Sequence, residues 1–362
     1  MFRPTAIINL NSLRQNIKYI KSILNKKTDI MPVVKANAYG HGLFQVAKIL
    51  KSEGIKYVSV ATIDEVEEVL KLNLGFTILH LGKCSKKHTD LYSNKNVICT
   101  INTINDVVFF AKQKNKKFNF HVKVNTGMNR MGCDPDELDS ILSLSEKKSN
   151  INIQGIYSHL ACSENKNKGH NQIQFDIFNL IVEKYKYKYL FHILNSGGMI
   201  NFKNHHMDFV RTGIAIYGIC PKGMESINLK PVMKFSAPVV LIKNIKKEEK
   251  IGYGCTYICK KNMKIGIVQC GYADGVPLFF DNKGFVFYKK NKVSILGRIS
   301  MDLTCIDLTE INSIKEGDSI TFWGDPDIDE SSLEYISKEF DSMPYIFLTS
   351  ISNRVERIYI EK

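Results

Sequence analysis

Lys35 is the first residue whose position suggests chemistry, because it ends the apolar run Met31-Pro32-Val33-Val34. Packing would hold the stem of such a lysine, and a lysine in this setting loses its proton more easily than one on the surface. A neutral amine can attack a carbonyl group and form a Schiff base. A lysine that ends a strand can equally extend its charge into solvent. This stretch alone supports both interpretations, so the other polar residues have to decide.

Several further polar residues follow other apolar runs in the same way. They are Lys123 with Arg130, His159, Asn195-Ser196-Gly197, and Arg211-Thr212-Gly213-Ile214. Only seven of the 50 basic residues are arginines, so each arginine indicates a need for a planar, permanently charged group. No carboxylate pair accompanies these residues, which disfavours glycoside hydrolysis, and no triad of metal ligands is present. The set is cationic and suits an anionic ligand.

Two clusters of small residues could supply backbone N–H groups and hydroxyls to a phosphate. These are Asn195-Ser196-Gly197-Gly198 and Thr212-Gly213-Ile214. Each cluster alone is consistent with an ordinary turn, and His159 alone with a structural histidine. Both clusters follow the seventh and eighth apolar runs, however, where barrels often bind phosphate. A lysine for a Schiff base together with a phosphate site is the outline of a pyridoxal 5′-phosphate (PLP) site.

A regular alternation of short apolar runs and helical segments would position these residues. The runs cover 31–34, 57–60, 77–81, 97–101, 120–124, 153–157, 190–194 and 207–211. Helical spacing occupies 64–72, 104–112, 135–147 and 172–186, and also 7–24, where Asn11 is the expected N-cap. Runs that are apolar throughout are typical of parallel strands covered on both faces. We therefore predict an α/β chain with an N-terminal (β/α)8 TIM-type barrel over residues 1–230. A doubly wound sheet is the alternative, but no run is followed by Gly-x-Gly-x-x-Gly.

The pattern changes after Pro231, where helical periodicity almost disappears. Strand-like runs recur at 239–242, 265–268, 285–288, 293–296 and 319–322, separated by turn residues, and one helix is expected over 331–337. We predict a C-terminal, mainly β domain over residues 231–362, with residues 1–10 as candidates to pair with it.

Composition excludes several classes of protein. The net charge of +14 comes from dispersed lysines rather than an aromatic-laced basic stripe, so nucleic-acid binding is not expected. No apolar stretch is long enough to cross a bilayer, and the first residues lack the layout of a signal peptide. Nine scattered cysteines cannot all pair, and they indicate reduced thiols in a cytoplasmic protein. Cys255 and Cys259 have no partner cluster for zinc, so no metal is expected.

The segment Val34-Lys35-Ala36-Asn37-Ala38-Tyr39-Gly40-His41-Gly42 closely resembles the PLP-attachment segment of bacterial alanine racemases. The resemblance continues through the chain in the family's order. It covers 121–132, Ser158-His159-Leu160-Ala161, 211–218, Gly252-Tyr253-Gly254, Gly271-Tyr272-Ala273-Asp274-Gly275, 297–302 and Arg354-Val355-Glu356-Arg357. The implied enzyme is an isomerase that interconverts L- and D-alanine with PLP by a two-base mechanism and supplies D-alanine for peptidoglycan.

The resemblance also implies a role for each matching residue. Lys35 would bind PLP and act as one catalytic base. Tyr253 would be the opposite base, presented by the other subunit of a homodimer whose active sites lie at the interface. A racemase needs bases on both faces of the substrate carbanion, so a shared site makes physical sense. Arg211 would face the pyridine nitrogen. His159 would link Arg211 by hydrogen bonds towards Tyr253.

The remaining implied roles concern the phosphate, the substrate and the route to the site. Tyr39, Ser196, Gly213 and Ile214 would hold the phosphate. Arg130 and the backbone N–H of Met301 would bind the carboxylate of a small amino acid. Lys123 would position Arg130, in some members as a carbamate, and Tyr272 would line the entrance. Asn353 occupies the position expected for a tyrosine that narrows the entrance and contacts the phosphate in some members.

Three alternatives remain at this point. A racemase of the same fold with broader specificity, or one acting on serine or lysine, would need a wider entrance. A non-catalytic PLP carrier shares a related barrel but would have no use for the domain that contains Tyr253. A decarboxylase of related architecture would favour a carboxylate at the pyridine nitrogen, where this chain offers Arg211.

Overall fold

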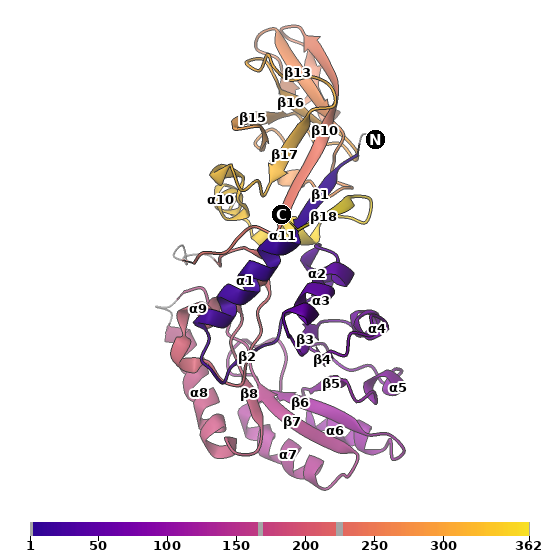
Figure 1. Ribbon diagram of the computed structural model, residues 1–362, viewed down its shortest axis with the longest axis vertical. Coiled ribbons are helices and arrows are strands. Elements are labelled where there is room, and N and C mark those ends of the chain that lie inside the picture. Colours follow the sequence, from indigo (N-terminus) through magenta and orange to yellow (C-terminus); the bar gives the residue numbers. More distant parts are fainter. Residues whose placement is uncertain (1–2, 166–168, 222–226, 362) are drawn as a thin grey trace.

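A computed structural model describes residues 3–165, 169–221 and 227–361 of the chain. It has two domains, drawn one above the other in Figure 1. The lower domain contains eight short parallel strands. They are β2 (Asp29–Ile30), β3 (Tyr57–Val60), β4 (Thr77–His80), β5 (Val97–Ile101), β6 (Phe118–Lys123), β7 (Ile151–Tyr157), β8 (Leu190–His192) and β9 (Phe209–Val210).

The eight strands form a ring, as the alternation of runs predicts. Strands β3 to β8 make one parallel sheet in chain order, and β2 pairs with β9. An isolated bridge between Val33 and Ser59 joins the β2 segment to β3. On the other side, the amide of Arg211 donates to the carbonyl of Leu194 at 3.0 Å and connects the ends of β9 and β8. The carboxyl ends of the strands therefore meet at one mouth.

Helices cover the outside of this barrel. They are α1 (Leu10–Ile23), α3 (Leu43–Ser52), α4 (Ile63–Lys71), α5 (Thr89–Tyr92), α6 (Ile104–Ala111), α7 (Leu138–Glu146), α8 (Gly169–Tyr185) and α9 (Ser196–Asn201), with 3₁₀ turns at Pro135–Glu137, Lys203–His205 and Ile214–Tyr217. The N-cap of α1 is Asn9 rather than the predicted Asn11. The Asn9 side chain accepts from the amides of Asn11 and Ser12 at 3.0 Å, because residues up to Asn9 belong to a strand.

The upper domain is mainly β. Its strands are β10 (Met233–Ile245), β11 (Lys250–Ile251), β12 (Tyr257–Ile258), β13 (Met263–Val268), β14 (Phe285–Tyr288), β15 (Asn291–Leu296), β16 (Thr304–Asp307) and β17 (Ser319–Trp323). Strand β10 pairs with both β17 and β13, which closes six of these strands into a small barrel. The pair β11–β12 encloses the 3₁₀ turn Tyr253–Cys255.

Both ends of the chain return to the upper domain (Figure 1). Strand β1 (Thr5–Asn9) pairs antiparallel with β10 and parallel with β18 (Glu356–Ile360). Helix α10 (Leu333–Glu339) and helix α11 (Pro344–Thr349) precede β18, and 3₁₀ turns occupy Leu278–Phe280 and Asp329–Ser331. Helix α11 lies against the lower domain, where it contacts the segment that follows Lys35.

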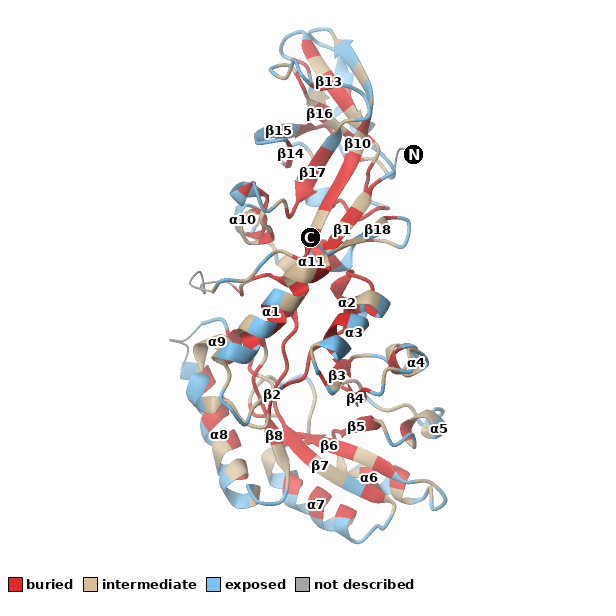
Figure 2. Cartoon of the chain, in the orientation of Figure 1, coloured by how far each residue is buried: buried red, intermediate tan, exposed pale blue. Residues whose placement is uncertain are grey.

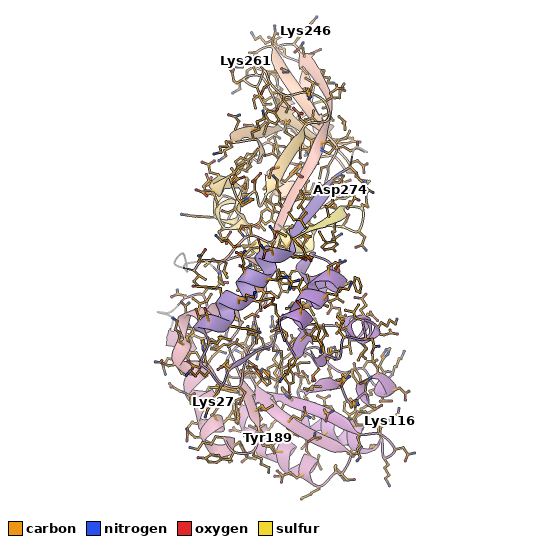
Figure 3. The ribbon with its side chains drawn as sticks, viewed as in Figure 1. Lys27, Lys116, Tyr189, Lys246, Lys261 and Asp274 are labelled. Atoms are coloured by element: carbon orange, nitrogen blue, oxygen red, sulfur yellow. The ribbon has the colours of Figure 1, made fainter. Side chains whose placement is uncertain are left out.

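The core runs through both barrels. In Figure 2 the barrel strands, β17 and the lower half of β10 are mostly buried, whereas the outer faces of α7 and α8 are exposed. In Figure 3 Lys246 and Lys261 lie near each other at the far end of the upper domain, whereas Lys27 and Lys116 lie in the lower domain. Among the described helices, none is long and apolar enough to cross a membrane.

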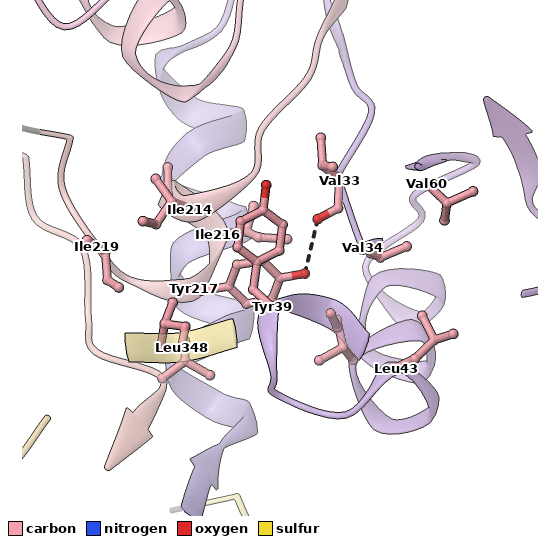
Figure 4. Close-up of a cluster of buried hydrophobic side chains, with 14 of the residues drawn as sticks. Val33, Val34, Tyr39, Leu43, Val60, Ile214, Ile216, Tyr217, Ile219 and Leu348 are labelled. Carbon is pink, nitrogen blue, oxygen red and sulfur yellow. Dashed lines mark hydrogen bonds between the residues drawn. The ribbon is translucent and has the colours of Figure 1, made fainter. Parts of the chain in front are cut away.

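A packed cluster beneath the barrel mouth holds the Lys35 segment (Figure 4). The hydroxyl of Tyr217 donates to the carbonyl of Val33 at 3.2 Å, and the rings of Tyr39 and Tyr217 lie 5.0 Å apart. Leu348 of α11 belongs to the same cluster, so the upper domain helps to fix the lower one.

Candidate active site

Lys35 begins a short helical element, α2 (Lys35–Tyr39), rather than ending a regular strand. Strand β2 stops at Ile30, and Pro32 lacks the N–H that would continue a hydrogen-bonded ladder. The next four residues, Ala36 to Tyr39, all have φ between 52° and 54°, which is a left-handed turn. This conformation costs L-residues energy. Side chains therefore have to hold it, and one contact is the Asn37 carboxamide oxygen, which accepts from the amide of Leu43 at 2.8 Å.

A cavity of about 470 Å³ opens at the barrel mouth beside this turn. Nine of the residues that the sequence predicts for the site line it: Lys35, Tyr39, Lys123, Arg130, His159, Ser196, Arg211, Gly213 and Ile214. These residues come from five separate strand ends, and the barrel brings them together around one space. Among the described residues, no cluster of His, Cys, Asp or Glu suits a metal ion.

Backbone amides and hydroxyls form one end of the cavity. The Ser196 hydroxyl accepts from the amides of Gly213 and Ala215 at 3.0 and 3.3 Å, which fixes the turn before Ile214. A Cβ atom on Gly213 would lie 2.5 Å from the Tyr39 hydroxyl, so only glycine allows this approach. Burial raises the pKa of Tyr39, which keeps its hydroxyl protonated as a donor. This arrangement of donors fits a phosphate.

Arg211 lies at the base of the cavity and is only 2% exposed. Its guanidinium donates to the carbonyl of Ser158 at 2.6 Å, to Nδ1 of His159 at 3.1 Å, and to Nδ1 of His192. Its Nε has no hydrogen bond to any residue in the described part of the chain, which leaves one N–H for a ligand. Burial lowers the pKa of Arg211 to about 10, so it remains charged at neutral pH.

The contacts of Arg211 determine where the neighbouring histidines hold their protons. His192 accepts at Nδ1, so its Nε2–H donates to Nδ1 of His121 at 2.8 Å. His159 also accepts at Nδ1, which places its proton on Nε2. Burial, reinforced by the charge of Arg211, lowers the pKa of all three histidines. The three histidines are therefore neutral, and Arg211 carries the positive charge among these four side chains.

Two lysines at the mouth have lowered pKa values. Burial lowers the pKa of Lys35, and the charge of Arg130 lowers it further. Burial, Arg211 and Arg130 together lower the pKa of Lys123 to about 8. Both amines therefore release a proton more easily than surface lysines, as nucleophilic or basic chemistry requires.

The structure adds residues that the sequence did not single out. Tyr345 of α11 lines the cavity, 6.0 Å from the ring of Tyr39, whereas Asn353 is exposed and does not line it. Within one chain the upper domain approaches the cavity through α11 and not through the loop before β18, and the role of Asn353 at the entrance stays a prediction. The sequence feature that could have indicated Tyr345 is the preceding Pro344, a residue typical of a helix start. The signal for His192 was a polar residue in the middle of an apolar run.

Three predicted residues lie outside this cavity, on the upper domain. Tyr253, Tyr272 and Met301 have exposed fractions of 71%, 43% and 51%. Two of them belong to adjoining loops, because the amide of Tyr272 donates to Ser300 and that of Ala273 to Met301, both at 3.1 Å. A Cβ on Gly254, next to Tyr253, would lie 3.4 Å from the guanidinium of Arg298. Within a single chain, Tyr253 therefore lies outside the cavity that Lys35 lines.

Comparison with known proteins identifies the family. The alanine racemase N-terminal domain family matches residues 8–221, and the alanine racemase C-terminal domain family matches residues 232–359. The chain belongs to the alanine racemase family. Within this family it is 34% identical to alanine racemase 2 of Caldanaerobacter subterraneus subsp. tengcongensis, over 99% of this chain and 95% of that protein.

Solved structures of the family share the whole fold. Alanine racemase of Clostridium difficile 630 superposes with a TM-score of 0.92 at 28% identity and covers 100% of this chain and 97% of its own. The Bartonella henselae alanine racemase structure with covalently bound pyridoxal phosphate gives a TM-score of 0.90 at 29% identity, over 99% of each chain. These likenesses confirm the predicted barrel followed by a mainly β domain.

Proposed function

We propose that this chain interconverts L- and D-alanine with PLP held at the barrel mouth, and that it acts as a homodimer. The observation that carries the proposal is the convergence of Lys35, buried Arg211 and the donors around Gly213 on one cavity. Membership of the alanine racemase family supports the reaction, and the covalent pyridoxal phosphate of the Bartonella henselae relative supports the cofactor.

The residues present fit PLP at both ends of the cavity. Tyr39, Ser196, Gly213 and Ile214 would hold the phosphate, and Lys35 would form the covalent bond. Arg211 would donate its remaining N–H to the pyridine nitrogen. When bound, PLP withdraws electrons from the substrate and makes its α-proton easier to remove.

The chain's own groups would then move the proton and hold the substrate. Lys35, with its lowered pKa, would exchange the α-proton on one face. Arg211 stays charged and is no proton donor to the ring, which would limit how far charge spreads into the cofactor and disfavour side reactions. Arg130, which lines the cavity, would orient the substrate carboxylate, and Lys123 beside it would fix Arg130.

The second base would be Tyr253 of another copy of the chain. Within one chain Tyr253 is exposed and lies outside the cavity. Met301 and Tyr272, which adjoining loops hold on the same domain, would complete the site from that copy by meeting the carboxylate and lining the entrance.

The experiment incubates the purified chain with PLP and either L-alanine or D-alanine and follows both enantiomers by chiral chromatography. We expect each substrate to approach an equal mixture. Serine and lysine are compared in parallel to measure specificity. Absence of alanine turnover in the PLP-loaded protein would contradict the proposal. Faster turnover of serine or lysine than of alanine would show that one of those amino acids is the preferred substrate.

A further inference from the structure

One carboxylate, that of Glu65, connects the Lys35 turn to the neighbouring strand end. Its Oε1 accepts from the amide of Ala36 at 2.7 Å. Its Oε2 accepts from the amides of Ala61 and Thr62 at 2.8 and 3.1 Å. Ala36 directly follows Lys35, and Ala61 directly follows β3. Glu65 thus binds two adjacent segments of the barrel mouth at once.

The bond to Ala36 lies where the backbone needs support. Ala36 is the first of five consecutive residues with positive φ, and only the last of them, Gly40, is a glycine. L-residues reach this region only at a cost, so contacts that favour it have to be supplied. The amide of Ala36 has no other hydrogen bond within the described ranges. Glu65 therefore holds the residue that sets the direction in which Lys35 leaves the backbone.

The charge of Glu65 also acts on Lys35. It raises the pKa of the Lys35 amine and opposes the lowering by burial and by Arg130. It does so without pairing with the amine, because the described residues include no ion pair of Lys35. The amine thus remains available to a ligand in the cavity, while a fixed negative charge tunes its proton affinity.

We propose that Glu65 is a positioning residue for Lys35, holding the left-handed turn by a charged hydrogen bond and placing a fixed negative charge near the amine. This inference rests on the proposed PLP-dependent function. Glu65 need not touch the substrate or the cofactor, because it acts through Ala36 and through space.

A matched control is available at the equivalent position of another barrel unit. Asp106 accepts from the amides of Asn102 and Thr103 at 2.9 and 3.0 Å and completes the capping box of α6, as Glu65 does for α4. Asp106 has no hydrogen bond to the Lys35 turn. Asp106→Asn therefore measures the effect of losing the charge of a capping carboxylate that does not contact the Lys35 turn.

Glu65→Gln separates the two functions of Glu65 with little change in shape. A glutamine has one acceptor oxygen, so it can serve the cap of α4 or the amide of Ala36, but its NH2 group must face the other. Two amides at the cap compete with one at Ala36. We expect the glutamine to keep the cap and to release the turn.

The experiment measures two properties of the full chain. The dissociation constant of PLP is measured from visible absorption. The pH midpoint of Lys35 acetylation by acetic anhydride is measured by mass spectrometry after the cofactor is removed. We expect Glu65→Gln to weaken PLP binding about tenfold and to lower the acetylation midpoint by roughly half a pH unit. The midpoint falls because a negative charge that favoured the protonated amine is lost.

Asp106→Asn should change neither quantity, although both variants lower the thermal midpoint to a similar extent. Equal behaviour of the two variants would overturn the inference, and so would weaker PLP binding in Glu65→Gln without a shift in the acetylation midpoint. A wild-type chain that binds no PLP would instead refute the proposed function.

Discussion

The barrel mouth and the exposed loops of the C-terminal domain differ in how completely their reactive groups are enclosed. Arg211 is 2% exposed and hydrogen-bonds to neighbouring carbonyls and imidazoles, whereas Tyr253 is 71% exposed. The Tyr253 hydroxyl has no hydrogen bond to any residue that the structure describes. Side chains that complete a site within one chain are normally held by their neighbours, so the exposure of Tyr253 supports the proposal that it acts on another copy of the chain.

The largest expected effect comes from the enclosed half. Lys35→Ala removes the amine that would bind the cofactor, and we expect loss of the visible absorption of the PLP-loaded protein after dialysis. Loss of both the covalent bond and a base should reduce turnover at least about 10⁴-fold. Absorption spectroscopy and chiral chromatography measure the two effects. Retained colour after dialysis would place the attachment site elsewhere.

The exposed half is probed by Tyr253→Phe. Since the side chain is exposed and unsupported within one chain, stability should change little. Loss of one general base should slow exchange of the α-proton of L-alanine by about 10²- to 10⁴-fold, and that of D-alanine far less. Nuclear magnetic resonance of exchange in deuterium oxide measures the two rates separately. Equal slowing of both enantiomers would contradict a model with one base on each face.

A pH-dependent effect is expected at Lys123, whose pKa is lowered to about 8. Only the neutral amine adds carbon dioxide, so carbamate formation should increase as the pH rises from about 7 to about 9. Carbon-13 nuclear magnetic resonance with labelled bicarbonate would detect the carbamate, and Lys123→Arg is the control. A signal that is unchanged in Lys123→Arg would assign the modification to another residue.

The smallest effect is expected where the C-terminal domain reaches the cavity of its own chain. Tyr345→Phe removes one hydroxyl from the phosphate end, and we expect PLP binding to weaken about two- to tenfold. Asn353→Ala is the matched control, because Asn353 is exposed and does not line the cavity. Titration of visible absorption compares them. Weaker binding in Asn353→Ala alone would support the role predicted for that residue at the entrance.

Much of the barrel was predictable because its strands are continuously apolar and its helices have a clear period. The strands Tyr57–Val60 and Val97–Ile101 have the predicted bounds, and α4 and α6 lie within a residue of theirs. The geometry around Lys35 was not predictable, because its left-handed turn depends on a contact of Ala36 with Glu65, which is distant in sequence. The position of Tyr345 beside the cavity was not predictable either, because it depends on how the two domains pack.

The site residues likewise divide into those that the sequence could indicate and those that it could not. Residues that follow apolar runs, such as His159 and Ser196, could be found from the sequence because parallel strands end at one mouth. His192 was missed because it lies within a run, where only its contact with Arg211 reveals a role. Whether Tyr253 meets Lys35 across two chains is a matter of assembly.

The most direct test of the shared site is a mixture of two inactive variants. Random pairing of Lys35→Ala with Tyr253→Phe makes half of the dimers mixed, and each mixed dimer has one site with both wild-type residues. We predict that equal amounts of the two variants, after exchange of subunits, regain about a quarter of wild-type alanine racemisation. If Lys35 and Tyr253 of the same chain formed the site, mixing would restore no activity beyond that of the separate variants.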